Sequence, residues 1–385
     1  MPHPDTSSSA TLSVPVLRAL RNLSLSASAQ ALRAVRDGVR GQRHRADRRL
    51  SLSLALQGGG AHGAFTWGVL DRLLEERTLE FPALTGASAG AMNATVLAHG
   101  LLTGGPAGAQ DALKNFWHAV STKAASYGYQ NTWLGPFRRH WPDFGTQSRI
   151  GMHLMTQLLS PYQFNPWDLN PLREILLDLV DFERLRRNRR IKLFLSATNV
   201  RTGRGRVFST REISVDSVLA SAALPSLHHA VALDGEHFWD GGYSSNPPIL
   251  PLVESTGNAD ILIVQIEPIR VETLPVTAEE IQNRTASHVF AAPLIQELET
   301  LQRIAQATRW SLPLSHGRRA RAIRLHHIDG GSDLSSLPLG SKLQPDWDSL
   351  CKLHDIGWHR ADDWIQLNAS AVGRHATYVW RDTAA

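Results

Sequence analysis

The chain has 385 residues, enough for one large α/β domain or for two smaller domains. Hydrophobic residues make up 42% of it and charged residues 19%, which excludes a disordered chain and a coiled coil. The formal net charge of +5 is concentrated in residues 1–50, where nine Arg stand against three Asp. The remaining residues are nearly neutral, so we expect no nucleic acid partner.

Residues 1–50 read as a separate basic segment. Their Leu and Val residues recur between Arg residues at a spacing that is compatible with an amphipathic helix on an anionic membrane, or with a flexible solvated tail. No secretory signal precedes the body, and no apolar run is long enough to cross a bilayer. The single cysteine, Cys351, excludes an intrachain disulfide. We expect a cytoplasmic protein, with residues 1–50 as a candidate contact to an anionic membrane surface.

The body begins with two similar units in which an apolar strand runs into glycines and then into a helix. The expected strands are residues 52–57, 81–85, 192–197, 206–208, 231–233 and 261–266, and the first two helices cover 64–76 and 91–102. The strand at 261–266 is rich in Val and Ile, which suits burial on both faces. Strands that alternate with helices predict a mainly parallel central sheet with helices on both sides.

Two regions differ from this alternation. Residues 121–170 are irregular and aromatic, and we expect either an ordinary packed insertion or a cap over an apolar channel. A long helix is expected at 278–308, followed by amphipathic helices that pack back on the body. The predicted organisation is therefore a segment at 1–50, a main domain at 51–270 that contains the insertion at about 121–170, and a mainly helical extension at 271–385.

A candidate nucleophile lies in the second unit. Gly86, Ser88 and Gly90 fit the pattern G-x-S-x-G, in which a serine occupies a sharp turn between a strand and a helix. The motif is weak alone because chance matches are common. Its context is favourable, since an apolar helix follows and would direct its first N–H groups at an oxyanion formed beside Ser88.

The first unit contains a glycine loop, with Gly58, Gly59, Gly60 and Gly63 around Ala-His. Its exposed N–H groups suit a phosphate or the oxyanion of acyl transfer. No Gly-Lys-Ser/Thr follows, which disfavours a phosphate-binding P-loop. A dinucleotide fingerprint fits poorly, but Glu80 stands near the required acidic position, so nucleotide binding remains an alternative.

A serine hydroxyl needs a base, and Asp240-Gly241-Gly242 is the most suggestive candidate. The two glycines allow a tight turn that presents the Asp240 carboxylate at the end of a strand. An aspartate is a weak base, so a direct pairing with Ser88 requires desolvation to raise its pKa toward working pH. A Ser-His-Asp arrangement with His326 or His327 is the alternative, because the order Ser, Asp, His along the chain would fit.

The three motifs in this order, followed by Asn246-Pro247-Pro248, resemble the bacterial patatin-like phospholipase family. The resemblance covers roughly residues 52–266, including Ser-Ala-Ala-Leu-Pro at 221–225. It implies a three-layer α/β/α fold and a Ser-Asp dyad without histidine. His62 departs from the pattern, because many members have Arg or Lys there.

The resemblance also implies the roles of the site residues. Ser88 would attack an ester carbonyl, Asp240 would take and return its proton, and the N–H groups of Gly58, Gly59, Gly60 and Ala89 would hold the oxyanion. Gly63, Gly86, Gly90, Gly241 and Gly242 would support the motifs, and the chemistry would need no metal or cofactor. The expected activity is lipid ester hydrolysis through an acyl-enzyme. The alternatives are a Ser-His-Asp esterase or thioesterase, and a non-catalytic lipid- or nucleotide-binding protein.

Overall fold

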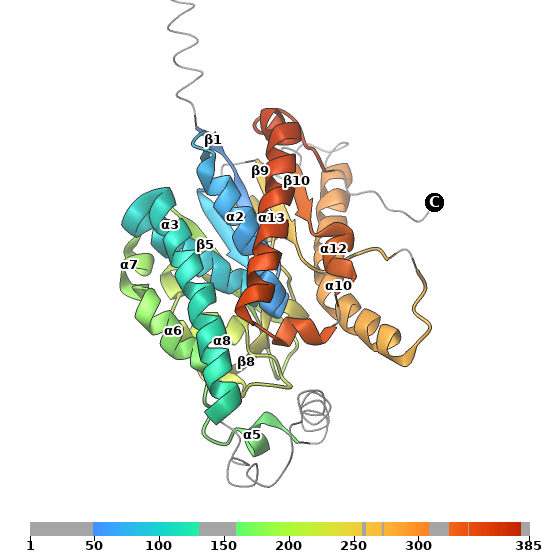
Figure 1. Ribbon diagram of the computed structural model, residues 1–385. Helices are drawn as coiled ribbons and strands as arrows, with labels where there is room; N and C mark the ends of the chain where they lie inside the picture. The colour runs from blue at the N-terminus through green and yellow to red at the C-terminus, as the bar shows by residue number, and fades with distance from the viewer. Residues whose placement is uncertain are drawn as a thin grey trace, which may run out of the picture. The chain divides into compact units, whose positions relative to one another are not determined.

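The computed structural model describes residues 49–130, 159–255, 259–271, 273–307, 323–337 and 339–378 (Figure 1). Leu50–Ala385 forms one compact unit. The predicted basic segment lies almost wholly outside the described residues, as does the middle of the predicted aromatic insertion, residues 131–158. Among the described helices, none combines the length and the apolar character that crossing a bilayer requires.

A central eight-stranded sheet organises the described part of the chain. Its order is β10-β9-β2-β4-β5-β8-β7, and β6 pairs with β5. The strands are β2 (Ser53–Leu56), β4 (Ala83–Gly86), β5 (Lys192–Asn199), β6 (Gly205–Ser209), β7 (Val231–Leu233), β8 (Glu236–Asp240), β9 (Asp260–Gln265) and β10 (Arg324–Asp329). The first five strands in the sheet order run parallel, whereas β6, β7 and β8 pair antiparallel. A separate two-stranded sheet joins β1 (Leu50–Ser51) to β3 (Leu79–Glu80).

Helices cover both faces of the central sheet, and the side chains of its strands alternate between two apolar clusters. In β2, Leu54 and Leu56 belong to one cluster and Ala55 to the other; β9 divides in the same way. The larger cluster includes residues of α2 (Gly63–Glu75), α3 (Ala89–Gln130), α6 (Pro171–Leu179), α7 (Phe182–Arg187), α8 (Val215–Ser221) and α13 (Trp347–Asn368). The smaller cluster packs α9 (Leu250–Ser255) and α10 (Ala278–Ala307) on the opposite face. This three-layer arrangement confirms the predicted α/β/α fold.

Most of the predicted helices and strands begin and end within about two residues of those in the structure. Burial of every residue in β9 confirms that this strand is covered on both faces. The helix expected at 91–102 is longer, since α3 runs to Gln130 with a break at Gly105, whose φ is 64° and which precedes Pro106. The strand expected to end at Asp240 is β8, whose bounds were not predicted, and β10 was not predicted at all. The short helices are α5 (Pro161–Phe164), α12 (Gly331–Ser335), η1 (Gly60–His62), η3 (Thr210–Glu212), η4 (Gly241–Tyr243), η5 (Leu339–Leu343) and η6 (Ala369–Ala371).

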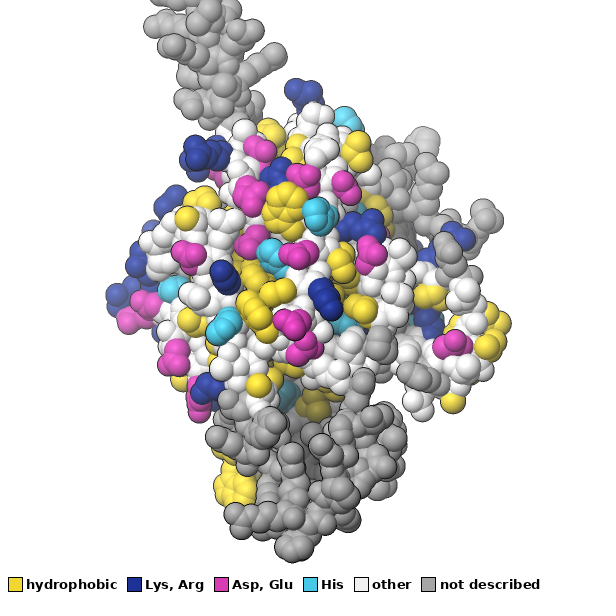
Figure 2. Space-filling model, in the orientation of Figure 1, with side chains coloured by type: hydrophobic (Ala, Val, Ile, Leu, Met, Phe, Trp, Pro, Cys, Tyr) yellow, Lys and Arg dark blue, Asp and Glu magenta, His cyan; other side chains and the backbone are white. Residues whose placement is uncertain are grey.

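The long C-terminal helix α13 packs directly on α2 (Figure 1). A Cβ at Gly68 would lie 1.8 Å from the carbonyl oxygen of His354, so the helix backbones touch at this point. Arg72 also pairs with Asp362 at 2.7 Å across the interface. On this face, basic and acidic side chains are interspersed (Figure 2), in keeping with a nearly neutral body.

Candidate active site

Ser88 lies in the sharp turn between β4 and α3. Its φ of 53° falls in the left-handed region, which is unusual for a residue with a side chain and costs about 1–3 kcal/mol. The surrounding structure holds this conformation: the Ser88 N–H donates to the carbonyl of Ser221 at 3.0 Å and lies 3.1 Å from its hydroxyl. The turn thus has the geometry of a nucleophile elbow.

The motif glycines allow the backbone to pack closely around this turn. A Cβ at Gly58 would lie 2.6 Å from the Cβ of Ser88, and one at Gly63 would lie 2.6 Å from the Cβ of Ala89. A Cβ at Gly86 would meet the backbone of Gly90 at 2.4 Å, and one at Gly90 would meet a carbonyl of β2 at 2.1 Å. The glycine loop and the nucleophile turn therefore approach each other to a distance that other residues would prevent.

The glycine loop presents fewer free N–H groups than the sequence predicts. The Gly58 N–H donates to Oδ1 of Asn246 at 2.7 Å, so this bond occupies it and Gly58 anchors the loop instead. Gly60 and Ala89 begin η1 and α3, where the first N–H groups have no partner within the helix. With Gly59, whose N–H has no acceptor among the described residues either, they form the available donor set. Asn246 belongs to the Asn-Pro-Pro motif, but no local pattern in the sequence indicates that its side chain holds the glycine loop.

Asp240 ends β8 and is fully buried. Its Oδ1 accepts the N–H of Gly242 at 2.7 Å, whereas its Oδ2 is buried without a hydrogen-bond partner. Burial raises the pKa of Asp240 to about 7, and interactions with the Ser88 hydroxyl and the Gly242 N–H oppose that rise. The Ser88 hydroxyl is therefore within range of the carboxylate, although their contact is not a fully formed hydrogen bond. Such contacts often tighten only when substrate is bound.

The Asp-Gly-Gly turn is held against β5. The Asp240 carbonyl accepts a hydrogen bond from the Thr198 hydroxyl at 2.8 Å, and a Cβ at Gly241 would lie 2.1 Å from the carbonyl oxygen of Ser196. At Gly242 a Cβ would lie 2.4 Å from the Phe290 ring. Both glycines are therefore required for the close packing that sets the direction of the Asp240 side chain.

An apolar cavity of about 310 Å³ opens at Ser88. Its aromatic wall comes from Phe116 and Trp117 of α3. The cap expected from residues 121–170 falls largely outside the described residues, and of its described aromatics Tyr162 and Trp167 are exposed. Phe116 and Trp117 precede the aromatic region expected at 121–170, so the aromatic lining of the cavity comes from residues outside that region.

His326 and His327, the histidines named in the Ser-His-Asp alternative, lie far from Asp240. His326 contacts Asp260 at 3.1 Å and His327 contacts Gln265 at 2.8 Å. Both lie on β10, five strand positions from β8 in the sheet order, which corresponds to roughly 24 Å at the usual strand spacing. This placement removes His326 and His327 as partners of Asp240.

Two other histidines lie near the site. His228 lines the Ser88 cavity, and burial lowers its pKa. The charged groups that act on it are Asp168 and His229, and not Asp240. Burial and the nearby Lys342 lower the pKa of His62 to about 4, so its side chain is neutral near pH 7.

The acidic residue required by the nucleotide-binding alternative is misplaced. Glu80 is exposed and lies on β3, which pairs with β1 outside the central sheet. In a dinucleotide fold this carboxylate would end the strand next to the glycine loop. The glycine loop instead faces a serine, so the geometry favours acyl transfer over nucleotide binding.

The fold and the site together define an α/β/α protein with a strained serine in an apolar cavity. The model of the family described as patatin-like phospholipase matches residues 54–253, just over half of the chain. The chain therefore belongs to the patatin-like phospholipase family, and it is a lipid ester hydrolase of that family. Comparison with curated proteins gives no match.

Similar solved structures include VipD from Legionella pneumophila, at 16% identity and a TM-score of 0.36 over 80% of this chain and 67% of that one. A structure of SpcU in complex with ExoU from Pseudomonas aeruginosa matches at 15% identity and a TM-score of 0.30, over 83% of this chain and 53% of that one. This chain thus spans about half the length of the chain that it matches in that structure.

Proposed function

We propose that the protein hydrolyses lipid esters through an acyl-enzyme, with Ser88 as the nucleophile and Asp240 as the base. The observation that carries this proposal is the buried Asp240 carboxylate, whose pKa is raised to about 7 beside the Ser88 hydroxyl. A base whose pKa lies near the operating pH is partly deprotonated and is still basic enough to accept a proton. The left-handed conformation of Ser88 supports the assignment, because it exposes the hydroxyl at a turn.

In the proposed reaction, Ser88 Oγ bonds to the ester carbonyl carbon while its proton passes to Asp240. The N–H groups of Gly59, Gly60 and Ala89 stabilise the oxyanion, together with the N-terminal dipole of α3. Collapse of the tetrahedral intermediate breaks the ester bond, and the leaving alcohol takes the proton from Asp240. Water then attacks the acyl-enzyme and gives its proton to Asp240, which returns it to Ser88 as the acid leaves.

The apolar lining of the cavity supports an apolar acyl chain as the group that Ser88 accepts. The cavity of about 310 Å³ includes Met92, Phe116, Ile175 and Leu224 in its lining. Burial of such a chain contributes about 0.8 kcal/mol per CH₂ group. The family description makes a phospholipid the proposed substrate class.

The test is hydrolysis of phospholipids, acylglycerols and p-nitrophenyl acyl esters by the wild type, Ser88→Ala and Ser370→Ala. Ser370 is an exposed serine in η6 and serves as the matched control. We expect activity in the wild type and the control, and a loss of at least about a thousandfold in Ser88→Ala. A fluorophosphonate probe should label the wild type but not Ser88→Ala. Retained hydrolysis by Ser88→Ala, or no hydrolysis by the wild type, contradicts the proposal.

We also propose that residues 1–50 contact anionic membranes through their Arg residues. Each basic residue near such a surface contributes about 1 kcal/mol at low salt. Deletion of residues 1–48 should weaken binding to vesicles that contain anionic lipid, while hydrolysis of a soluble ester persists. Equal vesicle binding by both proteins, or binding that does not fall at high salt, contradicts this role.

A further inference from the structure

A segment from the C-terminal part of the chain, η5 (Leu339–Leu343), lies directly against the glycine loop. Gly60 has a φ of 61°, and a Cβ on it would lie 2.4 Å from the carbonyl oxygen of Lys342. Next to it, the Ser341 hydroxyl lies 2.6 Å from Nε2 of His62. Two contacts therefore join η5 to the loop that carries the proposed oxyanion donors.

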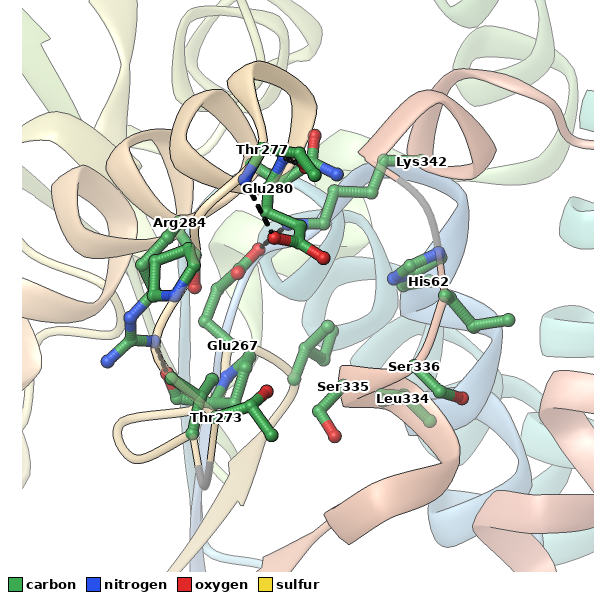
Figure 3. A pocket seen from close by; sticks show the side chains of 17 residues that line it. His62, Glu267, Thr273, Thr277, Glu280, Arg284, Leu334, Ser335, Ser336 and Lys342 are labelled. Atoms are coloured by element: carbon green, nitrogen blue, oxygen red, sulfur yellow. Dashed lines mark hydrogen bonds and ion pairs between the residues drawn. The ribbon is translucent and has the colours of Figure 1, made fainter.

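Lys342 forms an ion pair with Glu267, the second residue after β9. Figure 3 shows the Lys342 side chain extending from η5 across a cavity of about 400 Å³ toward Glu267, with His62 on the neighbouring turn. The side chain of Glu267 is 2% exposed and that of Lys342 is 20% exposed. Because the carboxylate is buried, removal of the lysine would take away its ion-pair partner and leave only Arg284, beyond ion-pair distance, as a compensating charge.

The end of β9 also holds the glycine loop from its other side. The N–H groups of Ile266 and Glu267 each donate to Oε1 of Gln57 at 2.7 Å. Gln57 directly precedes the loop, and a Cβ at Gly59 would lie 2.6 Å from the Ile266 side chain. The loop thus lies between β9 and η5, and the ion pair joins these two flanks.

We propose that Lys342 is a positioning residue whose ion pair with Glu267 holds η5 against the glycine loop and so directs the N–H groups of Gly59 and Gly60 toward Ser88. Lys342 also lines the Ser88 cavity, which places it between the two cavities. His62 cannot replace its charge, because its own pKa is lowered to about 4. The catalytic part of this inference rests on the proposed function.

The test compares Lys342→Met, which removes the charge but keeps an unbranched side chain, with Lys342→Arg, which keeps the charge. Lys352→Met, at an exposed lysine on α13, is the matched control. On a soluble p-nitrophenyl ester we expect kcat to fall about 10- to 100-fold in Lys342→Met, with KM changed by less than about threefold. Lys342→Arg should retain most of kcat, and the control all of it.

The partner residue gives a second test. Glu267→Gln should lower kcat to a similar extent, and the double variant with Lys342→Met should be no worse than either single variant, because both changes break the same interaction. The proposal is overturned if Lys342→Met keeps kcat within about twofold of the wild type, if the loss lies in KM, or if the two losses multiply.

Hydrogen exchange tests the positioning role independently, because the measurement does not require turnover. We expect faster exchange in peptides that cover residues 57–63 for Lys342→Met and Glu267→Gln, and unchanged exchange for Lys342→Arg and Lys352→Met. Unchanged exchange in Lys342→Met would overturn the positioning role. A wild type without Ser88-dependent hydrolysis would refute the proposed function alone, since the exchange result would still stand.

Discussion

Replacing Asp240 with asparagine should remove activity and yet stabilise the fold. Asparagine keeps the shape of the side chain and an oxygen that can accept the Gly242 N–H, but it carries no charge. The wild-type carboxylate is fully buried, and one of its oxygens has no hydrogen-bond partner. Its deprotonated form therefore destabilises the folded state, which is the physical origin of its raised pKa.

The size of the effect follows from the pKa shift. Burial raises the pKa of Asp240 from 3.8 to about 7, so between these values the folded protein keeps a proton that the unfolded chain has released. Folding stability consequently falls as pH rises through this window, by about 4 kcal/mol in total. About 2 kcal/mol of that loss has occurred by pH 5 and nearly all of it by pH 8. Asp240→Asn should therefore gain about 2 kcal/mol more at pH 8 than at pH 5.

Urea unfolding at pH 5 and pH 8 measures this difference directly, provided that the slope with urea concentration is unchanged. Asp178→Asn, at an exposed aspartate on α6, is the matched control and should show no such gain. A gain for Asp240→Asn that is equal at the two pH values, or a loss of stability at pH 8, would refute the assignment of a buried, destabilised carboxylate.

The same ionisation predicts that kcat/KM rises with pH and reaches half its maximum near pH 7, since deprotonated Asp240 is the proposed base. A profile that is flat from pH 5 to pH 8 would contradict it. Gly90→Ala should lower the unfolding free energy by about 2 kcal/mol or more, because a Cβ there would lie 2.1 Å from a carbonyl oxygen of β2. Gly104→Ala, with nothing within 4 Å, should be nearly neutral, and equal denaturation midpoints would refute the packing argument. Asn246→Ala leaves the Gly58 N–H without its acceptor and should cost about 1–3 kcal/mol of stability. Its kcat should fall as well, and wild-type values of both would exclude an anchoring role.

The architecture and the position of the proposed nucleophile could be predicted from local patterns in the sequence. Strands β2, β4 and β9 are short apolar runs bounded by turn residues, so their pattern is local and can be read along the chain. The same holds for Ser88, because its glycine neighbours are required by contacts within one turn and with the strand alongside. The fully buried β9 also follows from composition, since a strand covered on both faces must be apolar throughout.

The way in which distant segments complete the site became visible only in the folded molecule. β8 has the sequence Glu-His-Phe-Trp-Asp, without a clear strand pattern, and antiparallel pairing with β5 places its last residue, Asp240. Gly58 and Asn246 are 188 residues apart, and Lys342 and Glu267 are 75 apart. Local patterns encode backbone conformation, whereas the partner of a polar side chain depends on which remote segment packs against it. The donors available to an oxyanion, and the residue that holds them in place, could therefore be identified only from the packed molecule.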